Sequence, residues 1–115
     1  MSPVTRTGAR TIEGISTSCL VAGFGDYVAV SLTQFDAVGT VLHVQRNGEG
    51  KLDISVKMGQ REEPHLFVLA TQIAQSLGRV DSRKLVLTIA VKASTLEEME
   101  SIRALVDLVE AHRTW

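Results

Sequence analysis

Cysteine and proline are scarce in this 115-residue chain, which contains one cysteine, Cys19, and two prolines. A single cysteine cannot form a disulfide within the chain, and this predicts a reducing compartment, the cytoplasm or the nucleus. No stretch approaches the roughly 18 consecutive apolar residues that a transmembrane helix needs. The polar N-terminus MSPVTRTGAR also lacks the apolar core of a signal peptide. We therefore expect neither secretion nor insertion into a membrane.

An excess of charge of one sign is also lacking. Lys and Arg number 12, Asp and Glu number 13, and the formal net charge is −1 with no long run of either sign. This balance predicts no binding to nucleic acid or to an anionic membrane. Aromatic residues are few, at three Phe, one Tyr and one Trp, while 44% of the residues are hydrophobic. The sequence therefore predicts one folded domain with an aliphatic core.

Motifs for metal or nucleotide chemistry are missing as well. The three histidines are far apart and show no HxH or HxxxH spacing. Neither Gly23-x-Gly25 nor Gly48-x-Gly50 opens a helix, as a phosphate-binding loop would. We expect no metal, no cofactor and no catalytic residue. A thiol nucleophile formed by Cys19 and a histidine, as in a Cys-dependent hydrolase, is the enzymatic alternative, but no nucleophile motif surrounds that cysteine.

The strand pattern centres on Tyr27–Val44, where two β-rich runs are separated by Asp36–Gly39. The turn residues between them predict a β-hairpin whose first strand is central in a sheet. Before it, residues 1–10 are expected to be a flexible N-terminal tail, and Ile12–Gly23 one long strand interrupted at Gly14. After it, Leu52–Met58 alternates between apolar and polar residues and predicts a fourth strand whose apolar residues, Met58 among them, face the core.

The period then changes to that of helices. Pro64 to Gly78 predicts a first helix, whose second face is uncharged and includes Gln72 and Gln75. Leu85–Val91 predicts an internal strand. A last amphipathic helix is expected to open at two overlapping capping boxes, Ser94 with Glu97 and Thr95 with Glu98, and to end near the C-terminus. Helical spacing places Met99 in its buried stripe.

This order predicts a single α+β domain over residues 11–115, with an antiparallel sheet and two helices packed on one face. Tyr27, Phe35 and Val86, and also Leu20, would then lie on the other face of the sheet. A soluble monomer rarely exposes such a patch, so we expect a dimer that pairs sheet to sheet. These patterns alone describe an interaction domain, and a small scaffold subunit of a trafficking or signalling complex would show the same ones.

Several short motifs follow one another in a characteristic order: Thr33-Gln34-Phe35, Gly39-Thr40, Gly59-Gln60, Glu63-Pro64, Ala90-Val91-Lys92 and a terminal Trp115. From about Cys19 onward the chain resembles the proteasome assembly chaperone 3 family. Compared with the family pattern it carries an extra residue between Gln60 and Pro64 and a longer last helix.

The resemblance implies a non-catalytic chaperone of 20S proteasome assembly. Such a protein binds an α subunit, promotes ordered closure of the α ring, and is released as β subunits join. It implies pairing with a chaperone 4-like protein or with a second copy of the chain. We expect the dimer interface to include Tyr27, Phe35 and Val86. The residues expected to contact the α subunit lie in two loops and on the first helix: Asp36, Val38, Gly39, Gly59, Gln60, Arg61, Glu63, Gln72 and Gln75.

Overall fold

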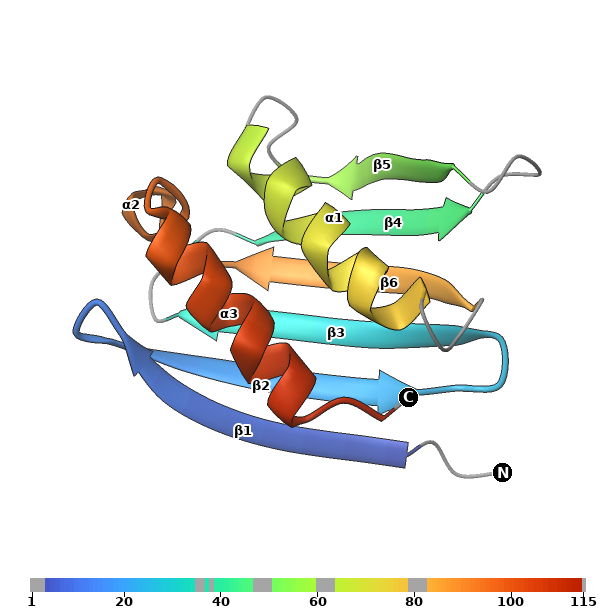
Figure 1. Ribbon diagram of the computed structural model, residues 1–115, viewed down its shortest axis with the longest axis horizontal. Helices are drawn as coiled ribbons and strands as arrows, with labels where there is room; N and C mark the ends of the chain where they lie inside the picture. Colours follow the sequence, from blue (N-terminus) through green and yellow to red (C-terminus); the bar gives the residue numbers. More distant parts are fainter. Residues whose placement is uncertain are drawn as a thin grey trace.

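The computed structural model describes residues 4–34, 37, 39–46, 51–59, 64–78 and 83–114. Six strands form one sheet in the order β1-β2-β3-β6-β4-β5, and the helices cover one side of it (Figure 1). The elements in chain order are β1 (Val4–Ile12), β2 (Ile15–Gly23), β3 (Tyr27–Gln34), β4 (Thr40–Arg46), β5 (Leu52–Met58), α1 (Pro64–Gly78), β6 (Lys84–Ala90), α2 (Ala93–Leu96) and α3 (Met99–Ala111).

The sheet is mixed, which confirms the α+β class but corrects the expectation of a wholly antiparallel sheet. β6 lies between β3 and β4, parallel to β3 and antiparallel to β4. The predicted hairpin over Tyr27–Val44 is therefore wrong, because its two strands are separated by a strand from much later in the sequence. Local turn chemistry does not distinguish a hairpin from a connection between strands that are not neighbours in the sheet.

From Val4 onward the N-terminal segment is a strand and not the expected tail, and residues 1–3 lie outside the described residues. Val4–Ile12 forms the edge strand β1, which pairs with β2 through nine consecutive residue pairs. Glu13 and Gly14 make the two-residue turn between them, with φ angles of 52° and 75°. Both angles are positive, as a type I′ hairpin turn requires. Gly14 thus marks a hairpin and not an interruption within one long strand.

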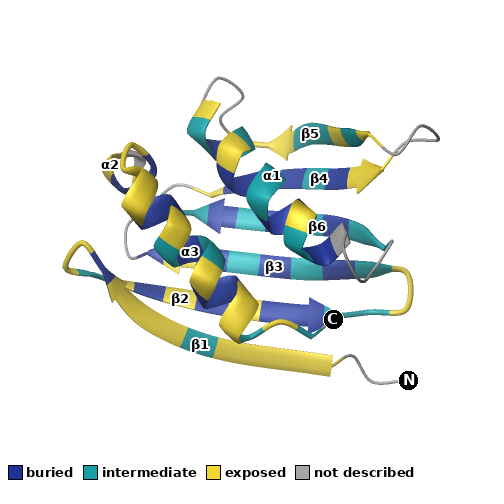
Figure 2. Ribbon diagram, in the orientation of Figure 1, coloured by how far each residue is buried: buried dark blue, intermediate teal, exposed yellow. Residues whose placement is uncertain are grey.

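The core lies between the sheet and the helices. Alternate side chains of the four central strands are buried under α1 and α3, including Leu32, Leu42, Leu87 and Ile89 (Figure 2). The two helices add Leu69, Ile73, Ile102 and Leu105, all at 0% exposure. As expected from the composition, the core is almost entirely aliphatic.

Two elements match their predicted bounds residue for residue: β5 over Leu52–Met58 and α1 over Pro64–Gly78. The last helix does not, because it is divided into α2 and α3 at Glu97 and Glu98. The predicted capping boxes do not cap α3, since Glu98 is its N-cap residue and makes no side-chain cap hydrogen bond. Thr95 is fully buried and its hydroxyl donates to the side chain of Gln34 instead.

Gln34 joins the end of β3 to the β6–α2 corner through a buried polar network. Its side-chain oxygen accepts from the backbone N–H of Lys92 at 2.9 Å and from the Thr95 hydroxyl at 3.3 Å. Its side-chain nitrogen donates to the Thr17 hydroxyl on β2 at 3.0 Å. Gln34 is 2% exposed, so these bonds are shielded from water. One side chain therefore positions three segments that lie far apart in the sequence.

Candidate functional site

The side of the sheet away from the helices is the main candidate for binding a partner. We call it the open face, because the helices cover only the opposite side (Figure 1). Strand periodicity and register place on it every second residue of each strand. These are Thr5, Thr7, Ala9, Thr11, Ser16, Ser18, Leu20, Ala22, Tyr27, Ala29, Ser31, Thr33, Lys84, Val86, Thr88, Ala90, Val41, His43, Gln45, Asp53, Ser55 and Met58, with Lys57 beside them at the register shift of β5, near His43.

Apolar side chains are present on the open face where the sequence predicts them. Tyr27 and Val86 lie there half-buried, and Leu20 is 40% exposed. Tyr27 stacks on Phe24 with ring centroids 4.6 Å apart, so the aromatic pair is held rigidly at the β2–β3 turn. The third predicted interface residue, Phe35, lies outside the described residues. The role of these side chains in an interface stays a prediction.

Met58 is an open-face residue that the sequence pattern places in the core. A register shift between Val41 and Leu42 pairs Met58 with Val41, so the alternation of β5 changes side at this point. As a result Met58 is 68% exposed. A one-residue bulge cannot be recognised in an alternating sequence, and for this reason the prediction that Met58 faces the core is wrong.

Charge is distributed unevenly over the open face. Its described residues on β1, β2 and β3 are uncharged, and Ala9, Ser18, Ser31 and Thr33 line a shallow hollow there. The open-face charges lie on the other half, on β4, β5 and β6.

On that half, His43 lies near two lysines. Burial lowers its pKa, and the positive charges of Lys84 and Lys57 lower the pKa further. Asp53 on β5 is the negative group of this half. This group of side chains could not be predicted from the sequence, because its members come from three strands that become neighbours only in the folded sheet.

The two predicted contact loops meet at one end of the sheet. Gly59, at the end of β5, has a φ angle of 102°, and a Cβ atom built on it would lie 2.8 Å from both the Gly39 carbonyl oxygen and the Thr40 Cα. Gly39 and Gly59 are therefore neighbours although 20 positions separate them. Most of the other predicted loop contacts lie outside the described residues: Asp36, Val38, Gln60, Arg61 and Glu63.

We expect Gly59→Ala to destabilise the fold by about 1–3 kcal/mol, because alanine is strained at this positive φ and its methyl group would collide with backbone atoms. Chemical denaturation monitored by circular dichroism measures the change. Gly25→Ala is the matched control, since a Cβ atom there meets nothing within 4 Å. Equal stability of both variants would show that the two loops are not held together at Gly59.

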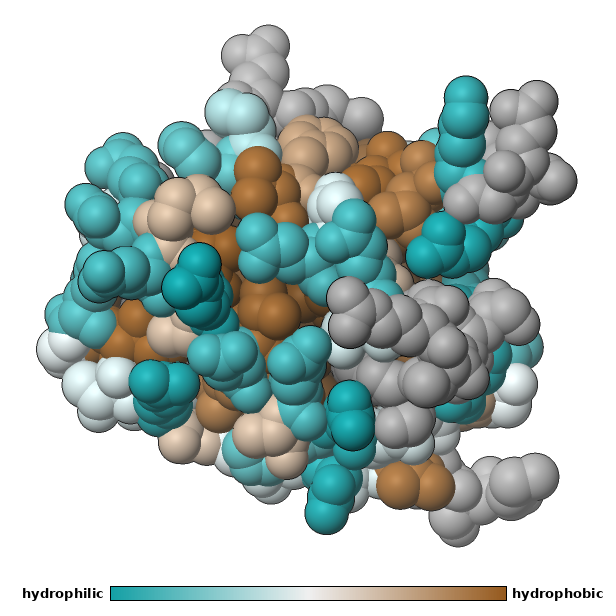
Figure 3. Space-filling model, in the orientation of Figure 1, coloured by the Kyte–Doolittle hydropathy of each residue, from teal (hydrophilic) through white to brown (hydrophobic). Residues whose placement is uncertain are grey.

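The outer face of α1 is the third predicted contact region. Gln75 is exposed and Gln72 is half-buried. Val68, which lies closer to the N-terminal end of α1, is 37% exposed. On the helix side seen in Figure 3, hydrophobic side chains gather near the middle among hydrophilic ones. α1 also contacts α3.

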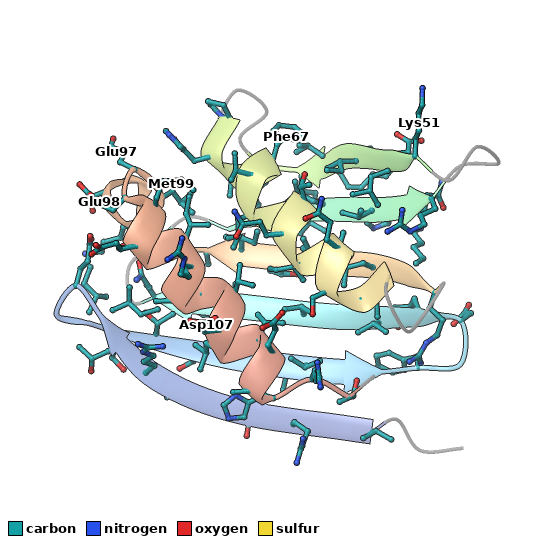
Figure 4. The ribbon with its side chains drawn as sticks, viewed as in Figure 1. Lys51, Phe67, Glu97, Glu98, Met99 and Asp107 are labelled. Carbon is teal, nitrogen blue, oxygen red and sulfur yellow. The ribbon has the colours of Figure 1, made fainter. Side chains whose placement is uncertain are left out.

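The carboxylates expected at the start of the last helix lie at an exposed corner. Glu97, Glu98 and Met99 lie together there (Figure 4), and Met99 is 57% exposed although helical periodicity placed it in the buried stripe. The break between α2 and α3 rotates Met99 out of that stripe. The buried stripe of α3 consists of Ser101, Ile102, Leu105, Leu108 and Val109.

Cys19 does not have the surroundings of a nucleophile. It is 2% exposed, and burial raises the pKa of its thiol to about 11. The imidazole of His112 lies over Gly8, the residue paired with Cys19 on β1, but its Nδ1 is 2.9 Å from the Leu108 carbonyl oxygen. A thiol with this pKa is almost fully protonated at neutral pH, and only the thiolate is strongly nucleophilic. The geometry supports a structural cysteine.

We therefore expect the Cys19 thiol to react with a disulfide reagent at pH 8 at least about 100-fold more slowly in the native protein than in urea. The rate of release of the coloured thiolate measures this directly. The unfolded protein serves as its own control for intrinsic reactivity. Similar rates in the two states would show that the thiol is accessible and would revive the hydrolase alternative.

Within the part of the chain that the structure describes, no three His, Cys, Asp or Glu side chains come close enough to hold a metal ion. In the same residues, no helix combines the length and the apolar character needed to cross a bilayer.

Comparison with known proteins now adds to this geometry. The sequence model of a family described as "Proteasome assembly chaperone 3" matches residues 30–112, well over half of the chain. The chain belongs to the proteasome assembly chaperone 3 family. The human protein named "Proteasome assembly chaperone 3" is 23% identical over 119 residues, covering 97% of this chain and 94% of the human one.

A solved structure shares the fold. It is titled as the crystal structure of a novel chaperone complex for yeast 20S proteasome assembly. The matched chain superimposes with a TM-score of 0.79 at 10% identity, covering 94% of this chain and 97% of that one. This supports the α+β fold, and the family indicates a chaperone of proteasome assembly.

Proposed function

We propose that this protein assists 20S proteasome assembly without catalysis, by binding an α subunit until the α ring has closed in the correct order. It acts as one half of a chaperone pair, in the cytoplasm or the nucleus, and departs when β subunits join. The observation that carries the proposal is the open face, a broad sheet surface on a member of the chaperone 3 family that no helix covers.

The open face suits pairing with a second sheet. Leu20, Tyr27 and Val86 supply apolar area, and the hollow beside them is lined by small side chains such as Ala9 and Ser31. Two sheets pack face to face when such side chains interdigitate. A partner that fills the hollow and covers the apolar side chains removes them from water, and this burial stabilises the pair.

The uneven charge of the open face favours a different chain over a second copy. Two stacked copies could bring their charged halves together, so that Lys57 and Lys84 face the same lysines, with Asp53 as the negative group on each described open face to offset them. They could also place these lysines against the uncharged half of the other copy, where the lysines lose water without gaining a partner. A chaperone 4-like chain with carboxylates opposite Lys57 and Lys84 avoids both costs.

The α subunit would contact the surfaces that pairing leaves free. These are the two loops that meet at Gly39 and Gly59, and the outer face of α1 with Gln72 and Gln75. No turnover is needed, because a chaperone that binds an open α ring more tightly than a ring carrying β subunits is released when these arrive. Such differential binding needs neither a cofactor nor an active site.

A tagged copy of the protein, isolated from its own cells at moderate salt, tests the proposal by mass spectrometry of the retained proteins. We expect α subunits without mature β subunits, together with a second small chaperone. Recovery of an unrelated stable complex without any proteasome subunit would contradict the proposal and favour a scaffold role.

A further inference from the structure

The outer edge of β1 is an unprotected strand edge. β1 lies at one border of the sheet, and among the residues that the structure describes no helix or strand lies alongside its outer side (Figure 1). Its residues are exposed except Gly8, which is half-buried, and Ile12, which is buried (Figure 2). The strand contains no proline and pairs with β2 over nine residues without a register shift. Such an edge presents a row of unpaired backbone groups to any strand of suitable shape.

The opposite edge, β5, differs in the features that protect an edge. Its pairing with β4 is interrupted by a register shift between Val41 and Leu42, and a bulge of this kind discourages the addition of another strand. Charged side chains lie on both edges, Asp53 and Lys57 on β5 and Arg6 and Arg10 on β1, so the bulge is the feature that distinguishes them. The contrast between the two edges indicates that β1 is the one suited to pairing.

The turn of the β1–β2 hairpin defines which backbone groups of β1 point outward. In a two-residue hairpin the flanking residues, Ile12 and Ile15, form the hydrogen-bonded pair. Because hydrogen-bonded and non-hydrogen-bonded pairs alternate along an antiparallel ladder, every second residue of β1 then turns its N–H and C=O away from β2. The outward-facing residues are Thr5, Thr7, Ala9 and Thr11.

We propose that the occupant of this edge is β1 of a second copy of the chain, antiparallel to the first and centred on Gly8. In this register Thr5 of each copy pairs with Thr11 of the other, and Thr7 pairs with Ala9. All outward-facing groups are then satisfied, with about eight backbone hydrogen bonds between the copies. The arrangement is two-fold symmetric and closed, so it ends at a dimer and does not propagate.

The charges at the two ends of β1 match this arrangement. At the first end, the Arg6 guanidinium donates to the Arg113 carbonyl at 3.4 Å, so two arginines lie near one another. At the hairpin end, Glu13, Glu98 and Glu100 line a cleft together with Arg10. Two-fold pairing brings the basic end of one copy to the acidic end of the other.

One pair in this register is unfavourable, because Arg6 lies opposite Arg10 of the second copy. The three glutamates around Arg10 outnumber its charge, so Arg6 still enters a negative environment. Val4, which is 60% exposed, comes opposite Ile12 of the second copy and gains apolar cover.

Edge pairing and open-face pairing use different surfaces. Joining two sheets edge to edge extends the sheet in its own plane and leaves both open faces on the same side. Each copy can then still bind a partner chain on its open face, which gives an assembly of two copies and two partners.

Sedimentation equilibrium of the purified chain tests the proposal. We expect the average mass to rise from 12.5 kDa toward twice that value between about 10 μM and about 1 mM, as a weak interface of this size predicts. The double variant Thr5→Pro/Thr11→Pro removes two outward N–H donors and none that bonds to β2. It should weaken self-association by at least about 10-fold, whereas Thr5→Ser/Thr11→Ser, which keeps both donors, should not.

Three results would overturn the proposal. The first is a mass of 12.5 kDa throughout the concentration range. The second is equal self-association of the proline and serine variants, with the fold of the proline variant verified by circular dichroism. The third is loss of self-association in Val86→Arg but not in the proline variant, which would show that two copies pair through their open faces.

Discussion

Val86→Arg is expected to weaken binding to the partner chaperone by at least about 100-fold, because it places a long cation at the centre of the open face. Val86 lies on β6, in the middle of the sheet, between Ala29 on β3 and His43 on β4. The new charge would be buried by the partner and would add to the positive side chains Lys57 and Lys84. Isothermal titration calorimetry of the variant with a chaperone 4-like chain measures the loss.

The fold should survive this substitution, since Val86 is only half-buried and points away from the core. Ala111→Arg adds the same side chain at an exposed position on α3 and should change the affinity by less than about 2-fold. If Val86→Arg binds the partner as tightly as the parent does, the open face is not the pairing surface.

Gln34→Leu is expected to lower the free energy of unfolding by about 2–4 kcal/mol, the largest stability effect of any single side chain discussed for this protein. The substitution leaves the Lys92 N–H and the Thr95 hydroxyl without their shared acceptor, in a site where Gln34 is 2% exposed. The Thr17 hydroxyl loses its donor as well. For a domain of this size such a loss corresponds to a fall in Tm of roughly 10 °C or more.

Gln45→Leu is the matched control, because it makes the same chemical change at an exposed position of β4. We expect it to alter stability by less than about 0.5 kcal/mol. Similar melting temperatures for the two variants would mean that the network around Gln34 does not hold the β6–α2 corner in place.

Local sequence signals correctly predicted the elements whose residue pattern does not depend on which strands or helices lie beside them. β5 follows from strict alternation, and α1 follows from Pro64 at its first position and Gly78 at its end. β1 was missed because it buries little on either side, and its strand character depends on pairing with β2. The position of β6 between β3 and β4 could not be predicted either, because its parallel neighbour lies more than fifty residues earlier.

The candidate site shows the same division. Tyr27, Leu20 and Val86 could be assigned to an uncovered face because their strands carry apolar residues on both sides. The neighbourhood of His43, Lys57 and Lys84 requires the strand order. The approach of Gly39 to Gly59 requires the three-dimensional path of two loops. Residues that act together across strands become visible only when the sheet order is known.

Native mass spectrometry of a reconstituted mixture tests the central claim most directly. Purified α subunits are combined with this protein and its partner chaperone, and β subunits are then added stepwise. We expect a complex of the chaperone pair with α subunits that loses both chaperones when β subunits bind. A chaperone pair that stays on the finished particle, or that never associates with α subunits, would contradict the proposed role in assembly.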